Sequence, residues 1–333
     1  IDTTTLIGND FIEGTDIVEC SEDLIDLVVN EINNSKKPLL IVGNGIRLSK
    51  GIFELKQLLS KINIPVISAV NGNDLVNDDY IGYAGRFGTH AQICANTLIS
   101  EADLVLSIGS RLYVRQIGYN FKGFAQQARK IYVDVDINEL NKPTLHPDIK
   151  VHSDAKFFLQ GLLKRDINKI DEDWLYHCHN KYILTPKVLD RQRNKKEFVS
   201  HYHFVEILGS LLKSNDHVIT SDGTANVVTM QVLKLTEDQR LITNTGNAPM
   251  GYGLTAAVGA ASTGIPVICI EGDGSIHLNI HELQTIKHYN LPIKIVLFNN
   301  DGYSSIKISQ KTFFKGKFVA SEKSSGVSFP NLK

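Results

Sequence analysis

The chain has 333 residues, of which 42% are hydrophobic, and a formal net charge of −1 at pH 7. This length predicts two domains, because a domain usually holds about 100–200 residues. The near-neutral charge argues against nucleic acid or an anionic membrane as a partner. No apolar run approaches the about 18 residues that a spanning helix needs. The four cysteines form no CxxC pair, so we expect a reduced, cytoplasmic protein.

The first half of the sequence alternates helical and apolar segments. Residues 1–20 carry polar turns and are typical of a linker, and helical periodicity begins at Ser21. Further helices are predicted over 50–61 and 89–100, and short apolar strands over 38–45, 64–70, 103–111 and 130–136. This alternation predicts one doubly wound α/β domain with a parallel sheet, which spans residues 21–165.

A second alternating block follows a polar connection. We expect residues 166–198 to join the two domains, with some helix around Trp174. Helices are predicted over 202–213, over 224–234 and from Gly251, and strands over 217–223, 240–244, 266–271 and 293–298. They predict a second doubly wound, parallel-sheet domain over 199–333. Because it holds only three or four strands, we expect it to be C-terminally incomplete, and the start at Ile1 indicates a fragment.

Two strand exits in the second block carry polar and glycine residues. The stretch Gly-Asp-Gly-Ser, residues 272–275, follows one strand, and Asn-Asn-Asp-Gly, residues 299–302, follows the next. A helical stretch separates them, and strand, helix, strand is the unit of a parallel sheet. Both exits therefore lie at the same carboxyl edge, where ligands bind. We expect Asp273 and Asn300 to be neighbours in space.

The chemistry of these exits indicates a phosphate with a metal ion. Bare N–H groups of a glycine turn suit an anion. A carboxylate such as Asp273 would repel that anion unless a hard cation such as Mg²⁺, which prefers oxygen ligands, lies between them. The Asp273 carboxylate, the Asn300 amide oxygen and the Gly302 carbonyl, with two diphosphate oxygens and a water, complete an octahedron.

The pair of motifs resembles that of thiamine-diphosphate-dependent enzymes. The resemblance implies that Asp273 and Asn300 bind Mg²⁺ through their side chains, and Gly302 through its carbonyl. Met250, in the segment Asn-Ala-Pro-Met-Gly, would be the apolar prop that bends the cofactor, and Asn226 would donate to the diphosphate. The full set of implied cofactor contacts is Gly223, Asn226, Ala248, Met250, Gly272, Gly274, Ser275 and Tyr303.

Residues 82–112 and 130–142 resemble the central domain of the acetolactate synthase branch. This implies a decarboxylating carboligase that joins a 2-oxo acid such as pyruvate to a carbonyl acceptor, as a homodimer or homotetramer. The activating glutamate is expected on a separate first domain that these residues lack, so no catalytic residue is assigned. Residues 304–310 lack the tryptophan that shapes the family's acceptor pocket. A 2-oxo acid decarboxylase and a keto-sugar carboligase therefore stay open as alternatives.

A flavin site in the first domain is also left open. The branch binds FAD at segments that resemble residues 43–45, residues 109–111 with Arg115, and residues 134–136. Glycine exits, an arginine and an acidic residue suit a pyrophosphate and a ribose. The same residues occur at strand ends of doubly wound domains that bind no flavin.

The sequence Gly-Tyr-Gly-Leu-Thr-Ala, residues 251–256, is consistent with a different function, the binding of a dinucleotide. It matches the dinucleotide pattern GxGxxG/A, and Glu271 lies where a ribose-binding acid would be. A nicotinamide-dependent dehydrogenase and a non-catalytic nucleotide-binding module are therefore alternatives. The lone match is weak, and we instead expect the small residues of this helix, including Gly259, to allow close packing. Residues 177–179, His-Cys-His, point apart on a helix and predict no metal site.

Overall fold

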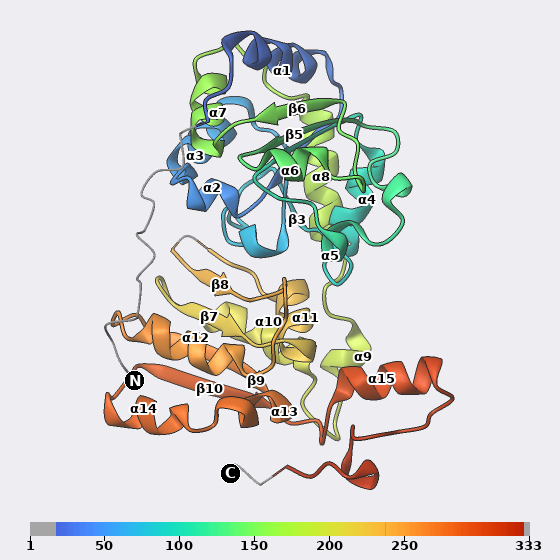
Figure 1. Ribbon diagram of the computed structural model, residues 1–333, viewed down its shortest axis with the longest axis vertical. Helices are drawn as coiled ribbons and strands as arrows, with labels where there is room; N and C mark the ends of the chain where they lie inside the picture. The colour runs from blue at the N-terminus through green and yellow to red at the C-terminus, as the bar shows by residue number, and fades with distance from the viewer. Residues whose placement is uncertain (1–17, 237, 330–333) are drawn as a thin grey trace, which may run out of the picture.

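The protein folds into two lobes, each built on a parallel sheet, in a computed structural model that describes residues 18–236 and 238–329. One sheet has six strands and the other four, and Figure 1 shows them in separate lobes with helices against both faces. Every pairing between the strands is parallel. The predicted fold class, two doubly wound α/β domains, is confirmed.

The six-stranded sheet has the order β3-β2-β1-β4-β5-β6. Its strands are β1 Pro38–Val42, β2 Val66–Ser68, β3 Tyr83–Arg86, β4 Leu104–Ile108, β5 Arg129–Asp134 and β6 Ile149–His152. The helices of this lobe are α1 Glu22–Asn34, α2 Gly45–Leu48, α3 Ile52–Ile62, α4 Ile93–Glu101, α5 Val114–Ile117, α6 Ile137–Asn141 and α7 Ala155–Leu163. The order reverses between β1 and β4, which is where such sheets commonly bind ligands.

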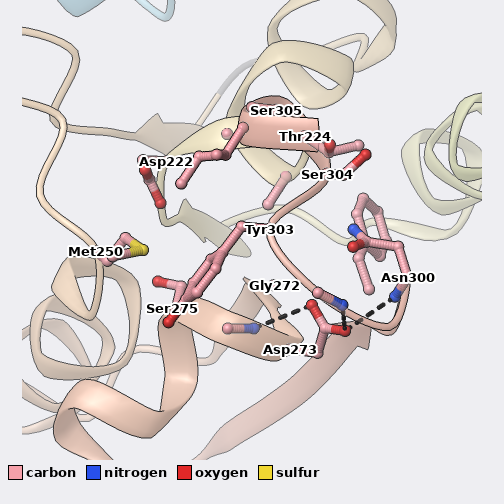
Figure 2. Close-up of a pocket in the computed structure, with 16 residues that line it drawn as sticks. Asp222, Thr224, Met250, Gly272, Asp273, Ser275, Asn300, Tyr303, Ser304 and Ser305 are labelled. Atoms are coloured by element: carbon pink, nitrogen blue, oxygen red, sulfur yellow. Dashed lines mark hydrogen bonds between the residues drawn. The ribbon is translucent and has the colours of Figure 1, made fainter. Parts of the chain in front are cut away.

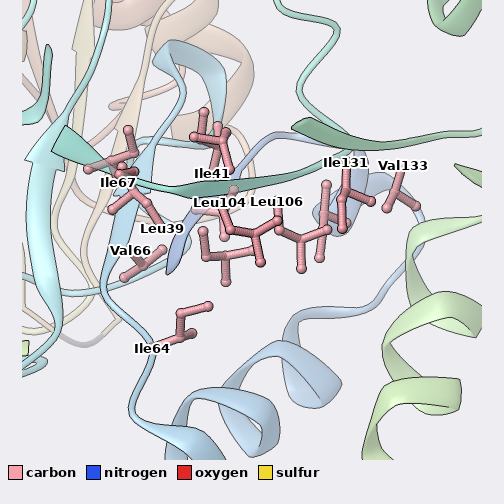
Figure 3. Packing of buried hydrophobic residues seen from close by; sticks show 14 of the residues in the cluster. Leu39, Ile41, Ile64, Val66, Ile67, Leu104, Leu106, Ile131 and Val133 are labelled. Atoms are coloured by element: carbon pink, nitrogen blue, oxygen red, sulfur yellow. The ribbon is translucent and has the colours of Figure 1, made fainter. Parts of the chain in front are cut away.

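The core of this lobe explains why its strands are continuous apolar runs. All residues of β1 and β4 are buried, because helices cover both faces of the sheet. Figure 3 shows side chains such as Leu39, Leu104 and Ile131, from three neighbouring strands, packed side by side. Strand β3 and strand β6 were not predicted, since one contains a positive-φ glycine and the other is short and half-exposed.

A helix in the expected connecting segment belongs to the same core. Helix α8, Glu172–Leu184, packs against β3, and its side chains Trp174, Cys178 and Tyr182 are buried. The indole of Trp174 donates to the carbonyl of Pro38 at the start of β1 over 2.9 Å. A short helix, α9 Asp190–Arg193, then leads to the second lobe.

The four-stranded sheet has the order β10-β9-β7-β8. Its strands are β7 His217–Thr220, β8 Arg240–Ile242, β9 Val267–Gly272 and β10 Ile293–Phe298. The helices are α10 His201–Leu211, α11 Gly223–Val232, α12 Tyr252–Ala261, α13 Asp273–Ile276, α14 Glu282–His288 and α15 Ser304–Phe313. The strand order reverses between β7 and β9, so the carboxyl ends of these strands frame the second crevice.

The glycines at the start of α12 allow close packing, but the glycine near its end does not. A Cβ on Gly251 would lie 2.5 Å from Asn279 Nδ2, and one on Gly253 would lie 2.6 Å from Glu271 Oε1. A Cβ on Gly259 would meet nothing within 4 Å, so the expectation that Gly259 allows close packing is wrong.

Polar contacts join the two lobes. The buried carboxylate of Asp74, in the loop after β2, pairs with Arg47 of its own lobe at 2.5 Å and with Arg240 of β8 at 2.9 Å. The fully buried Arg86 donates to the carbonyl of Leu233, just beyond α11, over 2.7 Å. These contacts join the loop after β2 and the end of β3 to the start of β8 and the end of α11.

Across residues 18–236 and 238–329, no helix combines the length and apolar character needed to cross a bilayer. All four cysteines are free.

Candidate functional site

The carboxyl ends of β7, β9 and β10 surround a pocket that gathers most of the predicted site residues. Nine of them line it: Gly223, Met250, Gly272, Asp273, Gly274, Ser275, Asn300, Gly302 and Tyr303. Asn226 and Ala248 instead line a cleft that adjoins this pocket. Residues from segments up to about 80 positions apart in sequence thus meet at one sheet edge, as parallel-strand geometry requires.

The Asp273 carboxylate organises the pocket floor. It is 5% exposed, and its Oδ2 accepts the backbone N–H groups of Asn300 and Gly302, each over 3.1 Å. Its Oδ1 accepts the N–H of Gly274 over 2.9 Å. Figure 2 shows these three bonds, of which the two from Asn300 and Gly302 fasten the exit of β10 to the exit of β9.

The oxygen atoms at this point fit a hard cation. Within the described residues, no lysine, arginine or histidine forms an ion pair with Asp273, although a buried carboxylate is costly without a cation. The Oδ1 atom of Asn300 is buried and has no hydrogen-bond partner among the same residues. One uncompensated carboxylate and one unpaired amide oxygen, on adjacent strand exits, are the ligand types that Mg²⁺ prefers.

The glycines of the pocket are needed for different structural reasons. Gly223 has φ +59°, a conformation that favours glycine. A Cβ on Gly274 would lie 2.4 Å from the Tyr303 ring, so that glycine is required by packing. Gly272 has an ordinary φ of −89°, and a Cβ there would meet nothing within 4 Å. Its backbone therefore faces open space at the pocket, as a cradle for a phosphate requires.

Met250 contributes an apolar side chain to the pocket. It is 37% exposed, whereas the chain's other methionine, Met230, is 3% exposed in the core. Figure 2 shows the Met250 thioether at one side of the pocket, opposite Asp273 and Asn300. Simple core packing therefore does not account for this side chain.

A buried polar cluster supports the pocket from below. The Ser275 hydroxyl accepts the N–H of Gly251 over 2.8 Å and lies 2.5 Å from the Ser221 hydroxyl. Glu271 is fully buried and accepts the N–H of Leu254, in the first turn of α12, over 2.8 Å. Burial raises the pKa of Glu271. Since this carboxylate is closed off from solvent, it cannot bind a ribose, and the predicted dinucleotide site is wrong.

The adjoining cleft lies between the two lobes and measures about 280 Å³. It shares Asp222, Gly223 and Ser305 with the pocket, so the two are continuous. The first lobe contributes His90 and Arg115 to its wall. Burial raises the pKa of Asp222, and the charge of Arg115 opposes that shift.

Asn226 lies in this cleft with its amide already engaged. Its side-chain N–H donates to the Thr243 hydroxyl over 2.7 Å, which connects α11 to the end of β8. Ala248, which also lines the cleft, has φ +48°, a left-handed conformation that is unusual for alanine.

Comparison with known sequences agrees with this geometry. The profile of the family described as "Thiamine pyrophosphate enzyme, central domain" matches residues 25–162, and that of the "C-terminal TPP binding domain" matches residues 222–332. The chain belongs to the thiamine pyrophosphate enzyme family. Thiamine pyrophosphate and thiamine diphosphate are the same compound, so the predicted family is confirmed, and the nicotinamide-dehydrogenase alternative is wrong.

Several curated thiamine pyrophosphate enzymes resemble the chain over most of its length. The acetolactate synthase large subunit of Cyanidium caldarium is 33% identical over 301 residues, which are 88% of this chain and 50% of the relative. The isozyme 2 large subunit of Escherichia coli K12 is 31% identical over 85% of this chain and 51% of its own length. Acetolactate synthase 1 of Nicotiana tabacum is 30% identical over 94% and 48%. The chain spans about half the length of the curated relatives it matches.

Two of the segments that suggested a flavin site, residues 43–45 and 109–111, lie in contact with each other. A Cβ on Gly43 would lie 2.2 Å from the carbonyl oxygen of Gly109, so these glycines allow two strand exits to touch. Arg111 pairs with Glu139 at 2.9 Å, and Arg115 lies in the cleft beside the thiamine pyrophosphate pocket. Arg111 is thus engaged within the chain and Arg115 lies in another cleft, whereas the buried Ser110 hydroxyl has no partner among the described residues. The flavin site stays a prediction.

Several residues of the combined site were not assigned by sequence, among them three at the start of α15 and one in the first lobe. Ser304, Ser305 and Ile306, at the start of α15, line the pocket, although this region shows no strong helical period. His90 carried no motif at all. The only sequence signal for the α15 residues was their position directly after a strand. The start of a helix that follows a parallel strand lies at the carboxyl edge of the sheet, where ligands bind.

Proposed function

We propose that the protein is a thiamine-diphosphate- and Mg²⁺-dependent carboligase, similar to acetolactate synthase, which decarboxylates a 2-oxo acid such as pyruvate and joins the remaining fragment to a carbonyl acceptor. The observation that carries this proposal is the buried, unpaired Oδ1 of Asn300 beside the uncompensated Asp273 carboxylate. It is supported by the resemblance to acetolactate synthases over most of the chain.

In this proposal the metal is held by the carboxylate of Asp273, the amide oxygen of Asn300 and the carbonyl of Gly302. The diphosphate would lie against the open backbone of Gly272 and the start of α11 at Gly223, since the first N–H groups of a helix have no partners within the helix and favour an anion. When bound, thiamine diphosphate supplies an electron sink for the carbanion left by loss of CO₂.

The chain's other residues orient the reactants and exclude water. Met250 presents an apolar surface at one side of the pocket, opposite Asp273 and Asn300, and would be the apolar prop for the cofactor that the family resemblance implies. Within the described residues, no ion pair engages Arg115, so its guanidinium is available to a substrate carboxylate. We assign the substrate to the cleft for this reason.

Residues at the start of α15 border the space for the acceptor and so decide which class of acceptor the protein takes. Residues 304–310 carry serines and isoleucines, without the indole typical of acetohydroxyacid synthases. Ser305 lies in both the pocket and the cleft, so a hydroxyl borders the acceptor space. This observation keeps a keto-sugar acceptor as a second candidate, and a 2-oxo acid decarboxylase as a third.

We further propose that the protein acts in the cytoplasm as a homodimer or homotetramer, with the activating glutamate supplied by a separate domain, as the resemblance implies. Flavin is left out of the proposed function, because the two arginines assigned to its pyrophosphate pair with Glu139 or lie in the other cleft.

The test is turnover of ¹³C-labelled pyruvate by the full-length protein with Mg²⁺ and thiamine diphosphate, followed by NMR for CO₂ and for ligated products. A panel of 2-oxo acids, aldehydes and keto-sugars serves as acceptors. We expect CO₂ release that stops on chelation of the metal and resumes when Mg²⁺ is restored. Absence of CO₂ release with every 2-oxo acid tested would contradict the proposal.

A further inference from the structure

A histidine from the first lobe stands in the cleft beside the proposed cofactor. His90 lies in the loop between β3 and α4 and lines the cleft together with Arg115, Asp222 and Ser305. Two of these, Asp222 and Ser305, also line the pocket of Asp273. His90 therefore borders the space in which a substrate would meet the cofactor.

Hydrogen bonds determine which nitrogen of His90 carries the proton in the neutral ring. The Thr89 hydroxyl lies 2.9 Å from the carbonyl oxygen of Arg115 and 3.0 Å from Nδ1 of His90. A carbonyl only accepts, so the hydroxyl donates its single proton to it and must accept from Nδ1–H. The neutral ring then carries its lone pair on Nε2, and the protonated ring presents Nε2–H.

The Nε2 atom is not used by the fold. Within the described part of the chain, no hydrogen bond or ion pair engages it. The backbone of the loop is braced by other groups, because the N–H of Thr89 also donates to Arg115 over 2.9 Å, and Gln231 donates to the carbonyl of His90 over 3.1 Å. The imidazole is thus oriented although the loop does not need it for support.

The charged groups that face the imidazole come from both lobes. Arg115 reaches the cleft from α5, and Asp222 from the exit of β7, and they are the charged residues besides His90 that line it. A guanidinium and a titratable ring on one wall suit a substrate that bears a carboxylate and a reacting carbonyl.

We propose that His90 is a catalytic general acid for carbon–carbon bond formation in the cleft. The inference rests on the proposed function. When a nucleophilic carbon adds to the acceptor carbonyl, its electron pair forms the new C–C bond, and the π pair of the carbonyl moves to the oxygen. That oxygen takes the proton of Nε2–H, and Nε2 keeps the electron pair of the broken N–H bond. The exposed ring then regains a proton from solvent, so protons and electrons balance.

The first experiment uses the full-length enzyme with Mg²⁺, thiamine diphosphate, ¹³C-pyruvate and the best acceptor of the panel. For His90→Ala, the ratio of ligated product to released CO₂ should fall about 100-fold, the lower end of what a positioned general acid contributes. Added imidazole should restore part of the loss. His146→Ala, which changes an exposed histidine outside the cleft, is the matched control. An unchanged product ratio in His90→Ala would overturn the proposal.

The pH dependence gives a readout that a merely structural role would not move. The product ratio of the wild-type enzyme should fall as pH rises, because a general acid acts only while it is protonated. In His90→Ala the ratio should be low and flat. Since Asp222 also lines the cleft, Asp222→Asn is measured in parallel, and a pH dependence that survives His90→Ala but is lost in Asp222→Asn would assign the proton to the carboxylate instead.

A second experiment needs no turnover. ¹⁵N NMR of neutral His90 should show the proton on Nδ1, and Thr89→Val should move it to Nε2, because the acceptor for Nδ1–H is lost. A wild-type ring with its proton on Nε2 would contradict the assigned geometry. If the wild-type enzyme releases no CO₂ from any 2-oxo acid, the proposed function fails, whereas a failure confined to the product ratio or the tautomer counts against His90 alone.

Discussion

The two sheets of this protein have crevices at equivalent positions. The first is filled by contacts between backbone segments, and the second is open and lined by an unpartnered polar group. In the six-stranded sheet the order reverses between β1 and β4, and in the four-stranded sheet between β7 and β9. At the first crevice Gly43 and Gly109 touch backbone to backbone. At the second, Gly272 faces open space, and the side chain of Asn300 lacks a partner.

This difference shows how to tell a ligand site from a structural strand end. Both edges carry glycine exits, acidic residues and an arginine or an amide, so residue type alone does not separate them. At the first edge Arg111 has a partner in Glu139, although the buried Ser110 hydroxyl has none among the described residues. At the second edge the buried Asp273 carboxylate accepts three N–H groups but pairs with no cation in the described part of the chain, and the buried amide oxygen of Asn300 has no partner there. Native proteins rarely leave a buried charge and a buried polar atom in this state without a ligand.

The largest expected effect is the loss of cofactor binding in Asp273→Ala. Calorimetry should show the Mg²⁺-dependent affinity for thiamine diphosphate reduced by more than about 100-fold, since loss of groups that only orient a metal ligand already costs 10–100-fold. Asp136→Ala is the control from the other sheet. Its carboxylate caps α6 through the N–H of Asn138, so we expect a loss of about 1 kcal/mol in stability and unchanged affinity. Equal affinities for wild type and Asp273→Ala would refute the assigned site.

Gly43→Ala and Gly272→Ala should separate folding from binding. A Cβ on Gly43 would lie 2.2 Å from Gly109 O, so thermal unfolding should show a destabilisation of about 3 kcal/mol. Gly272→Ala adds a methyl group in open space at an ordinary φ, and the unliganded protein should be unchanged or more stable by about 0.4–1 kcal/mol. Its affinity for thiamine diphosphate should fall. Full affinity in Gly272→Ala would show that this glycine has no role in binding.

Asn300→Ala should affect metal binding more than stability, unlike most substitutions that shorten a buried polar side chain. Because the Oδ1 atom has no partner in the described residues, its removal should change the free energy of unfolding by less than about 1 kcal/mol. Affinity for Mg²⁺ in the presence of thiamine diphosphate should nevertheless drop about tenfold. Chemical denaturation and metal titration on the same sample measure both, and a large loss of stability with no loss of affinity would make Asn300 a structural residue.

The smallest effect is expected at the edge of the first sheet. Arg111 is largely exposed, so Arg111→Gln should cost at most about 1 kcal/mol and leave thiamine diphosphate affinity unchanged. The purified protein should show no flavin absorption bands, and none after incubation with FAD. Flavin that copurifies with wild type and is lost in Arg111→Gln would restore the flavin prediction.

Strong apolar runs made most of the fold predictable. Strands such as β1 and β4 lie within their predicted segments because burial on both faces leaves a continuous hydrophobic signal. Strand β3 was missed because it contains the buried Arg86 and a glycine at φ +104°, neither typical of a strand. Helix α15 was missed because its apolar residues are exposed and show no buried face.

The proximity of Asp273 and Asn300 was predictable because parallel strands bring consecutive exits together. The partners of the flavin-like segments were not, since the ion pair of Arg111 with Glu139 and the contact of Gly43 with Gly109 depend on distances that no local pattern encodes. The position of His90 was equally hidden, because the cleft exists only where the two lobes meet. The domain boundaries at 21–165 and 199–333 stay predictions.

The three hydrogen bonds accepted by Asp273 have a thermodynamic consequence. Two of them, from the N–H groups of Asn300 and Gly302, fix the exit of β10 as part of folding, so the backbone that carries the Asn300 side chain is already held in place before an ion arrives. Loading the site then requires little loss of backbone entropy, and emptying it leaves the loop ordered. Repeated removal and return of the metal should therefore be reversible without any unfolding of the surrounding sheet.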